Sequence, residues 1–389
     1  MKRRHWLAAG CAQCAAVWSG GVLAQRSQDA PEPAASWRSP DRFRRPDLAS
    51  DEGGLWALMD REETRLRRSP FNMRDERLHD YLHGVACKLA ADHCPDVRLY
   101  AVRTPFFNAS MAPNGMLQVW SGLLLRVENE AQLAAVLGHE LGHYLQRHTL
   151  DRLRDARSRS AFATFMAAFG VVGLVGQLAT LASAFGFTRE QERDADRIGL
   201  TLMRNAGYDP RECSKVWDNL LAEAAAGPGK GEAKNPMLAT HPSSEERSRT
   251  LAAMAEGQAG GFVGATEYAQ ALEPFRFGLL EDEMKRGQHD ESVVLIDRML
   301  KRSPDRPDLL YFRGEAYRVR GKPGDLEAAL ADLHQAAALG NEPAEVHRSL
   351  GYIHQRLGQA AEAGAEFARY VDLLPNAPDA NLIRTYLPS

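Results

Sequence analysis

Two histidines with a glutamate between them stand out in the run HELGH at residues 139–143. Residues four apart on a helix lie one above the other, so His139 and His143 can direct imidazole nitrogens at one ion. Zinc sites with three protein ligands leave a position open for water. Glu140 lies beside that face, where it can take a proton from such a water. The pattern predicts a catalytic zinc site with Glu140 as general base.

A second acidic run, ERDAD at residues 192–196, lies on a later predicted helix that spans about residues 188–205. Glu192 can supply a third metal ligand. Asp196, one turn further on, can hydrogen-bond a ligand histidine and fix its tautomer. Either run alone could be a solvated helix face. The two runs together favour one site with His139, His143 and Glu192 as ligands.

The spacing of apolar residues predicts the elements that hold this site. From about Asn129 onward they recur at helical spacing, which gives the HELGH helix a core-facing side: Leu133, Val136, Leu137, Leu141 and Leu145. Helical patterns near 51–67 and 74–93 come before strand-like runs at 97–102 and 116–120. This order predicts an α+β domain that is mostly helical and contains a small β-sheet.

Residues 160–188 carry no formal charge and are long enough to cross a membrane. A single crossing would separate Glu192 from His139 and His143, and the segment is too short for two crossings. We therefore expect a buried or surface-lying helical hairpin, or a gate over the site. Burial and peripheral contact with a membrane surface through residues 160–188 both remain open.

Residues 256–389 show internal repetition after a helical connector. Gly287 and Gly321 are 34 positions apart, which is the period of a tetratricopeptide helix pair. Gly314 and Gly351 are 37 apart, which is that period with a three-residue insertion. Small residues at these positions suit the close helix crossings of such repeats. An unrelated helical bundle is the alternative.

The first 24 residues resemble an export signal, with Lys2, Arg3 and Arg4 before an apolar stretch and a cleavage site before Gln25. A retained membrane anchor is disfavoured because glycines interrupt the stretch. Weaker resemblances to a twin-arginine signal and to a lipoprotein box at Cys11 stay open. Residues 25–50, rich in proline, serine and arginine, predict a flexible leader.

Length and charge bound the remaining possibilities. A chain of 389 residues suggests two folded domains, here residues 51–255 and 256–389. The formal net charge of −3 gives no large basic field, so we expect no nucleic-acid partner. In an oxidising compartment Cys87 and Cys94 could form a disulfide. Cys213 would then be a small buried apolar residue.

HELGH paired with the ExxxD of FTREQERDADRIG resembles the M48 family of zinc metallopeptidases. That resemblance implies a zincin-like domain followed by an α-helical repeat domain, with zinc held by His139, His143 and Glu192. Residues 108–115 resemble the family's segment entering the strand beside the site, where a substrate peptide can add as an extra strand.

The resemblance also brings His241, in the run THP, and Arg247 to the site. His241 would either occupy the metal's open position as a latch or stabilise the oxyanion, and Arg247 would have the latter role. Glu140 would take the proton from water and pass it to the leaving amine.

Within the family, a signal, a soluble catalytic domain and repeats together resemble periplasmic proteases that assist outer-membrane protein assembly. This implies an exported zinc endopeptidase that cleaves misfolded or stalled envelope proteins, with the outer-membrane assembly machinery as a partner of the repeats. The rival hypothesis is a repeat-based chaperone or adaptor whose latched metal site seldom cleaves. A membrane-embedded prenyl-type protease is disfavoured because several long apolar spans are lacking.

Overall fold

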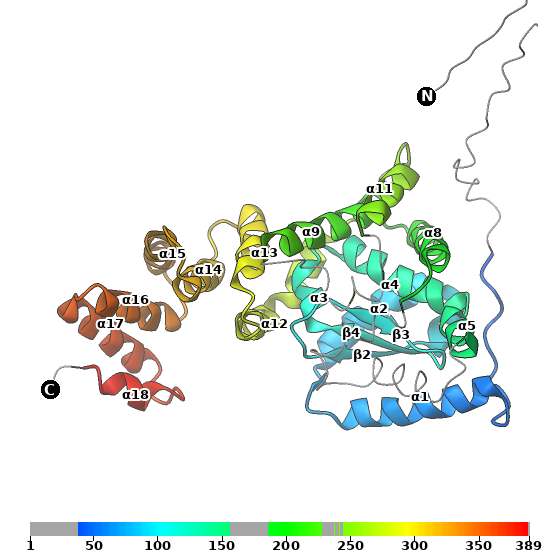
Figure 1. The fold of residues 1–389 in the computed structure, drawn as a ribbon, viewed down its shortest axis with the longest axis horizontal. Helices are drawn as coiled ribbons and strands as arrows, with labels where there is room; N and C mark the ends of the chain where they lie inside the picture. The colour runs from blue at the N-terminus through cyan, green and yellow to red at the C-terminus, as the bar shows by residue number, and fades with distance from the viewer. Residues whose placement is uncertain (1–37, 156–185, 228–236, 238–240, 242–243, 388–389) are drawn as a thin grey trace, which may run out of the picture. The chain divides into compact units, whose positions relative to one another are not determined.

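The computed structural model describes residues 38–155, 186–227, 237, 241 and 244–387 (Figure 1). The predicted signal and the first half of the predicted leader, residues 25–37, lie outside the described residues. The same holds for nearly all of the uncharged segment 160–188. In the described half of the leader, Phe43 packs against the hydrophobic core, so this part of the leader does not behave as the predicted flexible segment. Among the helices of the described part, none is long and apolar enough to cross a membrane.

The described part of the chain is mostly helical and contains one small sheet, as predicted. Its first elements build the region around HELGH: α1 (Asp51–Arg68), β1 (Asn72–Met73), α2 (Glu76–Ala90), the 3-10 helix η1 (Ala91–Asp96), β2 (Arg98–Val102), β3 (Ala109–Met111), β4 (Met116–Trp120), α3 (Ser121–Arg126), α4 (Glu130–Leu145), α5 (His148–Asp155), α8 (Arg189–Asn205), α9 (Glu212–Ala226) and α11 (Ser244–Ala255). The later elements are all helices: α12 (Ala265–Lys285), α13 (His289–Arg302), α14 (Pro307–Arg320), α15 (Asp325–Leu339), α16 (Glu345–Arg356), α17 (Ala360–Leu373) and α18 (Ala380–Arg384).

The sheet has the strand order β1-β2-β4-β3. β2 and β4 run parallel, with Leu99 opposite Leu117. β3 pairs with β4 in the antiparallel direction and forms an outer edge of the sheet. Helix α4 packs against β3, and α2 packs against both α4 and β2. The edge of the sheet therefore lies beside the helix that carries HELGH.

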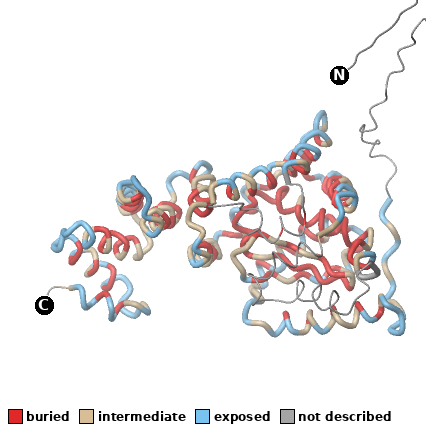
Figure 2. Tube along the Cα trace, viewed as in Figure 1, coloured by how far each residue is buried: buried red, intermediate tan, exposed pale blue. Residues whose placement is uncertain are grey.

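Helix α4 is buried on nearly all sides, as the red tube in the centre of the sheet-containing region shows (Figure 2). Its N-cap residue is Asn129, whose side chain accepts a hydrogen bond from the backbone N–H of Gln132. Glycine allows α8 to approach closely: a Cβ added at Gly142 would lie 2.8 Å from the carbonyl oxygen of Ala195. A larger residue at Gly142 would push the two helices apart.

Helix α8 begins at a capping box. The side chain of Thr188 accepts from the backbone of Gln191, whose side chain accepts from the backbone of Thr188. This cap fixes the first turn of α8, and Glu192 lies in that turn. The start of the helix therefore sets where Glu192 meets α4.

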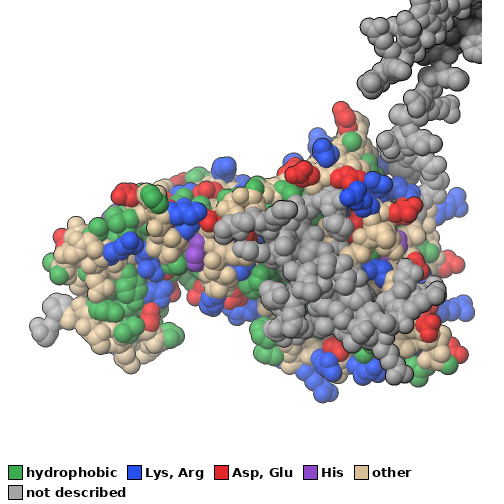
Figure 3. Space-filling model, in the orientation of Figure 1, with side chains coloured by type: hydrophobic (Ala, Val, Ile, Leu, Met, Phe, Trp, Pro, Cys, Tyr) green, Lys and Arg blue, Asp and Glu red, His purple; other side chains and the backbone are tan. Residues whose placement is uncertain are grey.

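The C-terminal helices pack as successive neighbours, α14 on α15 and α16 on α17. The two glycines predicted at helix crossings lie where predicted. A Cβ at Gly314 would lie 3.0 Å from Leu333, and one at Gly351 would lie 2.5 Å from Phe367. On the face shown in Figure 3, basic and acidic side chains are interspersed over the described residues.

Buried charges connect these helices to the region around HELGH. Arg126 at the end of α3 donates to Glu283 of α12 at 3.0 Å and to Glu223 of α9 at 2.7 Å. Ser292 of α13 also donates to Glu283. All of these side chains are buried, so this ionic junction is part of the core between α3, α9, α12 and α13.

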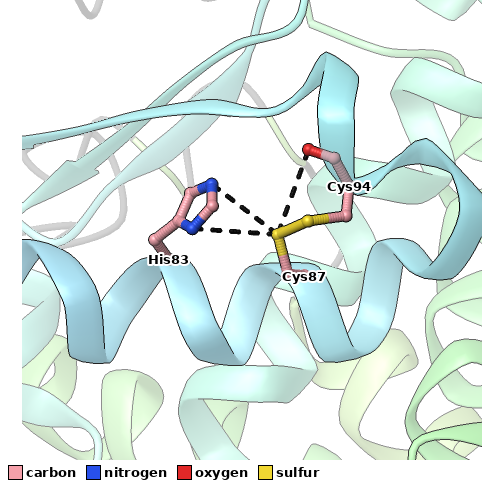
Figure 4. Close-up of a disulfide and its surroundings, with 3 residues drawn as sticks. All are labelled: His83, Cys87 and Cys94. Carbon is pink, nitrogen blue, oxygen red and sulfur yellow. Dashed lines mark hydrogen bonds between the residues drawn. A yellow bond between two sulfur atoms is a disulfide. The ribbon is translucent and has the colours of Figure 1, made fainter.

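The expected cysteine chemistry is confirmed. Cys87 at the end of α2 and Cys94 in η1 form a disulfide, and the imidazole of His83 faces Cys87 (Figure 4). Cys213 is a free and buried thiol.

Candidate active site

Four buried side chains converge at the contact between α4 and α8. His139, His143, Glu192 and His241 each offer one ligand atom, and these atoms lie within 4.8 Å of one another. The Nε2 atoms of His139 and His143 are 3.1 Å apart. Glu192 places its carboxylate oxygens 3.6 Å from His139 Nε2 and 3.7 Å from His143 Nε2.

The far side of the His139 ring faces a carboxylate. Nδ1 of His139 lies 2.9 Å from Asp196 Oδ1. Asp196 accepts two hydrogen bonds from Arg247, and a third nitrogen of that guanidinium lies 2.9 Å from Glu192 Oε2. The guanidinium stacks on Trp217 at 3.9 Å from the ring centre. Arg247 therefore contacts the carboxylates of both Asp196 and Glu192.

The far side of the His143 ring faces another histidine. Nδ1 of His143 lies 2.9 Å from Nδ1 of His148, the first residue of α5. Phe187 stacks on the His143 ring with 3.8 Å between ring centres. Since all these rings pack closely, His143 has little freedom to turn away from the cluster.

This donor set fits a divalent metal ion. If each Nδ1–H donates to the acceptor on its far side, both Nε2 lone pairs face one another at 3.1 Å, an arrangement that a cation stabilises. Neighbouring ligands around tetrahedral zinc are about 3.3–3.6 Å apart for bonds of about 2.0–2.2 Å. The separations among His139, His143 and Glu192 are close to this spacing. Two imidazoles and a carboxylate are also a common catalytic zinc set.

His241 lies in the same cluster. Its Nδ1 is 2.8 Å from Glu192 Oε1 and 3.2 Å from His139 Nε2, while its Nε2 is 3.8 Å from Glu140 Oε1. Its backbone N–H donates to the carbonyl of Met237. His241 is therefore near enough to serve as a fourth ligand, on the side of the cluster where Glu140 lies.

Glu140 points toward the edge of the sheet. Burial raises the pKa of its carboxyl group to about 7, and the backbone N–H of Met111 on β3 donates to it. A carboxylate with a pKa near neutrality can both take and release a proton at that pH. The candidate base therefore lies between the cluster and an edge strand.

The electrostatics keep the ligands in metal-binding forms. Burial, followed by the charge of Arg247, lowers the pKa of His139 to about 4. Burial also lowers the pKa of His143. Burial alone would raise the pKa of Glu192, but His241 and Arg247 reverse this and lower it. At neutral pH these groups are two neutral imidazoles and one carboxylate, which is the state that binds zinc.

The structure brings together every site residue that the sequence predicted: His139, Glu140, His143, Glu192, Asp196, His241 and Arg247. Of the segment predicted beside the site, 108–115, residues 109–111 form β3. Sequence reasoning missed His148, Trp217 and Phe187. His148 was visible as a third histidine shortly after HELGH. Nothing in the spacing of Trp217 or Phe187 marks them out.

Comparisons with known proteins confirm the predicted resemblance. Residues 72–255 match peptidase family M48, and residues 320–378 match the tetratricopeptide repeat. The chain is 25% identical over 392 aligned positions to the beta-barrel assembly-enhancing protease of Yersinia pestis, an alignment covering 86% of this chain and 78% of that protein. The protein of the same name from Escherichia coli strain K12 is 30% identical over 199 positions, which cover 47% of this chain and 40% of that protein.

A second group of relatives matches over a shorter region. The mitochondrial metalloendopeptidase OMA1 of Arabidopsis thaliana is 35% identical over 151 positions, which cover 39% of this chain and 30% of that protein. The chain thus spans less than half the length of several curated relatives that it matches.

Proposed function

We propose that the chain is a zinc-dependent endopeptidase, because residues 72–255 match peptidase family M48. The observation that carries the proposal is the buried contact of His139, His143 and Glu192, with Glu140 beside it. Zinc, when bound there, would polarise the scissile carbonyl and acidify the attacking water.

The chain's own residues supply the rest of the chemistry. Glu140 takes the proton of the attacking water and passes it to the leaving amine. Arg247 and Asp196 hold Glu192 and His139 in place. A substrate peptide lies along the outer edge of β3 as an added strand, next to Glu140.

His241 decides how readily the site works, and two roles are open to it. The 2.8 Å distance from His241 Nδ1 to Glu192 Oε1 supports a latched resting state, in which the imidazole occupies the place of the attacking water. Alternatively it stabilises the oxyanion. Replacing His241 with Ala distinguishes the two roles: peptidase activity rises if His241 is a latch and falls if it stabilises the oxyanion.

The decisive test of the enzyme assignment is the Glu140→Gln variant. We expect cleavage of an unfolded protein such as casein to fall by about 10²–10⁴-fold, because the proton acceptor is lost. The zinc content should stay at that of the wild type, since Glu140 is not a ligand. The control is Glu190→Gln, an exposed residue in the first turn of α8. Equal cleavage by wild type and Glu140→Gln would refute the proposal.

For the cellular role we propose an exported protease that removes misfolded or stalled envelope proteins during outer-membrane protein assembly. Three features support export to the periplasm: the signal-like N-terminus, the Cys87–Cys94 disulfide and the similarity to beta-barrel assembly-enhancing proteases. The repeats would bind the assembly machinery, and misassembled proteins would be the substrates.

The position of His241 also favours a second candidate, an adaptor that works through its repeats while the site stays latched. A cell assay separates the two by comparing Glu140→Gln with a deletion of residues 307–389. This deletion retains α12 and α13, whose Glu283 and Arg298 contact Arg126 and Glu223. Rescue of envelope defects by Glu140→Gln but not by the deletion would favour the adaptor.

A further inference from the structure

His148 lies directly behind one of the candidate metal ligands. Its Nδ1 is 2.9 Å from Nδ1 of His143, and both side chains are buried. The two rings are inclined at 70° with their centres 5.1 Å apart. At this distance and inclination the two nitrogens can share one proton in a hydrogen bond.

The direction of that hydrogen bond decides what His143 can do. A neutral imidazole carries its proton on one nitrogen and accepts on the other. If Nδ1 of His143 is the donor, its Nε2 presents a lone pair toward His139 and Glu192. If His148 is the donor instead, His143 carries its proton on Nε2, and that nitrogen cannot bind a cation.

We propose that His148 is a positioning residue that holds His143 as the Nδ1–H tautomer, so that Nε2 is ready to bind the metal. This inference rests on the proposed zinc site. It gives His143 the same kind of support that Asp196 gives His139, whose Nδ1 lies 2.9 Å from the Asp196 carboxylate. A neutral acceptor behind one ligand and a charged acceptor behind the other would make the two ligands electronically unequal.

The backbone before His148 is built to aim this side chain. Helix α4 ends at Leu145, and Arg147 adopts φ 57°, a left-handed conformation that favours glycine and costs other residues about 1–2 kcal/mol. The turn lets α5 begin immediately at His148 and brings its ring back over His143.

Contacts from outside the site hold the turn. Arg147 forms an ion pair with Glu52 of α1 and lies over the ring of Phe43, 5.3 Å from its centre. Phe43 in turn packs edge-on against Tyr144 of α4. These contacts stabilise the left-handed conformation of Arg147, and that conformation places His148 beside His143.

The test compares substitutions at His148 by zinc affinity, measured by competition with a chelator. Asn carries an oxygen near the place of Nδ1 and can accept the His143 proton, whereas Leu cannot. We expect His148→Leu to weaken zinc binding by about 10–100-fold and His148→Asn to stay within about threefold of the wild type. The matched control is His347→Leu, which removes another buried histidine, in α16, and should leave zinc affinity unchanged.

A second readout needs no metal. In zinc-free, full-length protein, the ¹⁵N chemical shifts of His143 should show the Nδ1–H tautomer in the wild type and in His148→Asn, but a mixture in His148→Leu. If His148→Leu does not fold, His148→Phe replaces it, because the phenyl ring has no nitrogen or oxygen that could accept the His143 proton.

Two outcomes would overturn the inference: wild-type zinc affinity in His148→Leu, or an Nε2–H tautomer of His143 in the wild type. Neither would touch the proposed zinc site itself. That proposal fails separately, if His143→Ala retains wild-type zinc affinity.

Discussion

The carbonyl oxygen of Ala195 lies where a Cβ on Gly142 would meet it at 2.8 Å, so the helices that carry the candidate ligands touch backbone to backbone. The same contact recurs one turn away, where a Cβ on Gly138 would lie 3.1 Å from the carbonyl oxygen of Gly199. Glu192 lies one turn before Ala195 on α8. Its distance to His139 and His143 therefore depends on residues that carry no chemistry themselves.

Gly142→Ala is expected to weaken the zinc site. The added methyl group meets backbone and not a flexible side chain, so α8 must move away, at a cost of about 1–3 kcal/mol in the free energy of unfolding. Because Glu192 moves with α8, zinc affinity should fall as well. Urea unfolding and chelator competition measure the two effects.

Gly84→Ala is the matched control for that substitution. Gly84 also lies inside a helix, α2, but a Cβ there would have no heavy atom within 4 Å. We expect this variant to be more stable than the wild type by up to about 1 kcal/mol, with unchanged zinc affinity. Equal behaviour of the two variants would show that the close approach of α4 and α8 does not matter.

Arg247→Leu is expected to be strongly destabilising. The guanidinium is buried between Asp196, Glu192 and the Trp217 ring. Its removal leaves two buried carboxylates without their cation, which costs about 3–5 kcal/mol. Chemical unfolding measures this loss. Arg193→Leu is the comparison, since Arg193 pairs with Glu246 on the exposed surface and its loss should cost less than about 1 kcal/mol.

The sequence predicted the elements whose pattern extends over several turns or a full strand. The helix around HELGH, the strands near 97–102 and 116–120, and the glycines at repeat crossings all lie as expected. β1 and β3 were missed because strands of two and three residues are too short to show alternation. β3 nevertheless matters for the site, because Met111 contacts Glu140.

Contacts between distant segments were the part of the site that sequence could not predict. His148 follows His143 closely, but its role depends on the left-handed turn at Arg147, and an arginine at that position gives no signal for such a turn. Trp217 supports Arg247 from a different helix. The ionic junction joins Arg126 to Glu283, which is 157 positions away in the sequence.

Glu283→Gln tests that junction. Glu283 is fully buried and accepts from Arg126 and Ser292. Removing its charge leaves the buried Arg126 with only Glu223 as a carboxylate partner within the described residues, so we expect a loss of about 3 kcal/mol in the free energy of unfolding at pH 7. Glu281→Gln, an exposed change two residues away on α12, should be close to neutral.

The difference in unfolding free energy between wild type and Glu283→Gln should depend on pH, and the sign of this dependence follows from the pKa of Glu283. Burial would raise the pKa of Glu283, but Arg126 and Arg286 lower it below its unfolded value of about 4.3. The carboxylate therefore contributes its full stability above that value, and the contribution is lost as the pH falls through the folded pKa. The stability difference between wild type and Glu283→Gln should be constant from pH 7 to about pH 5 and shrink below about pH 4.3. A difference that grew on acidification would contradict the ionic role.

Replacing both Cys87 and Cys94 with Ala is expected to destabilise the fold without altering the site chemistry. The disulfide closes a loop of about eight residues, and the chain-entropy estimate for such a loop is about 2–3 kcal/mol. Inside this loop Ala91 has φ 47°, a positive value that favours glycine. His93 of the same loop packs against Tyr144 near the end of α4. Loss of the bridge should therefore increase the mobility of the C-terminal end of α4 more than that of His139.

Urea unfolding of the double variant should match that of reduced wild type, and zinc affinity at low temperature should be unchanged. An unfolding free energy within about 0.5 kcal/mol of the oxidised wild type would show that the bridge does not stabilise the native state.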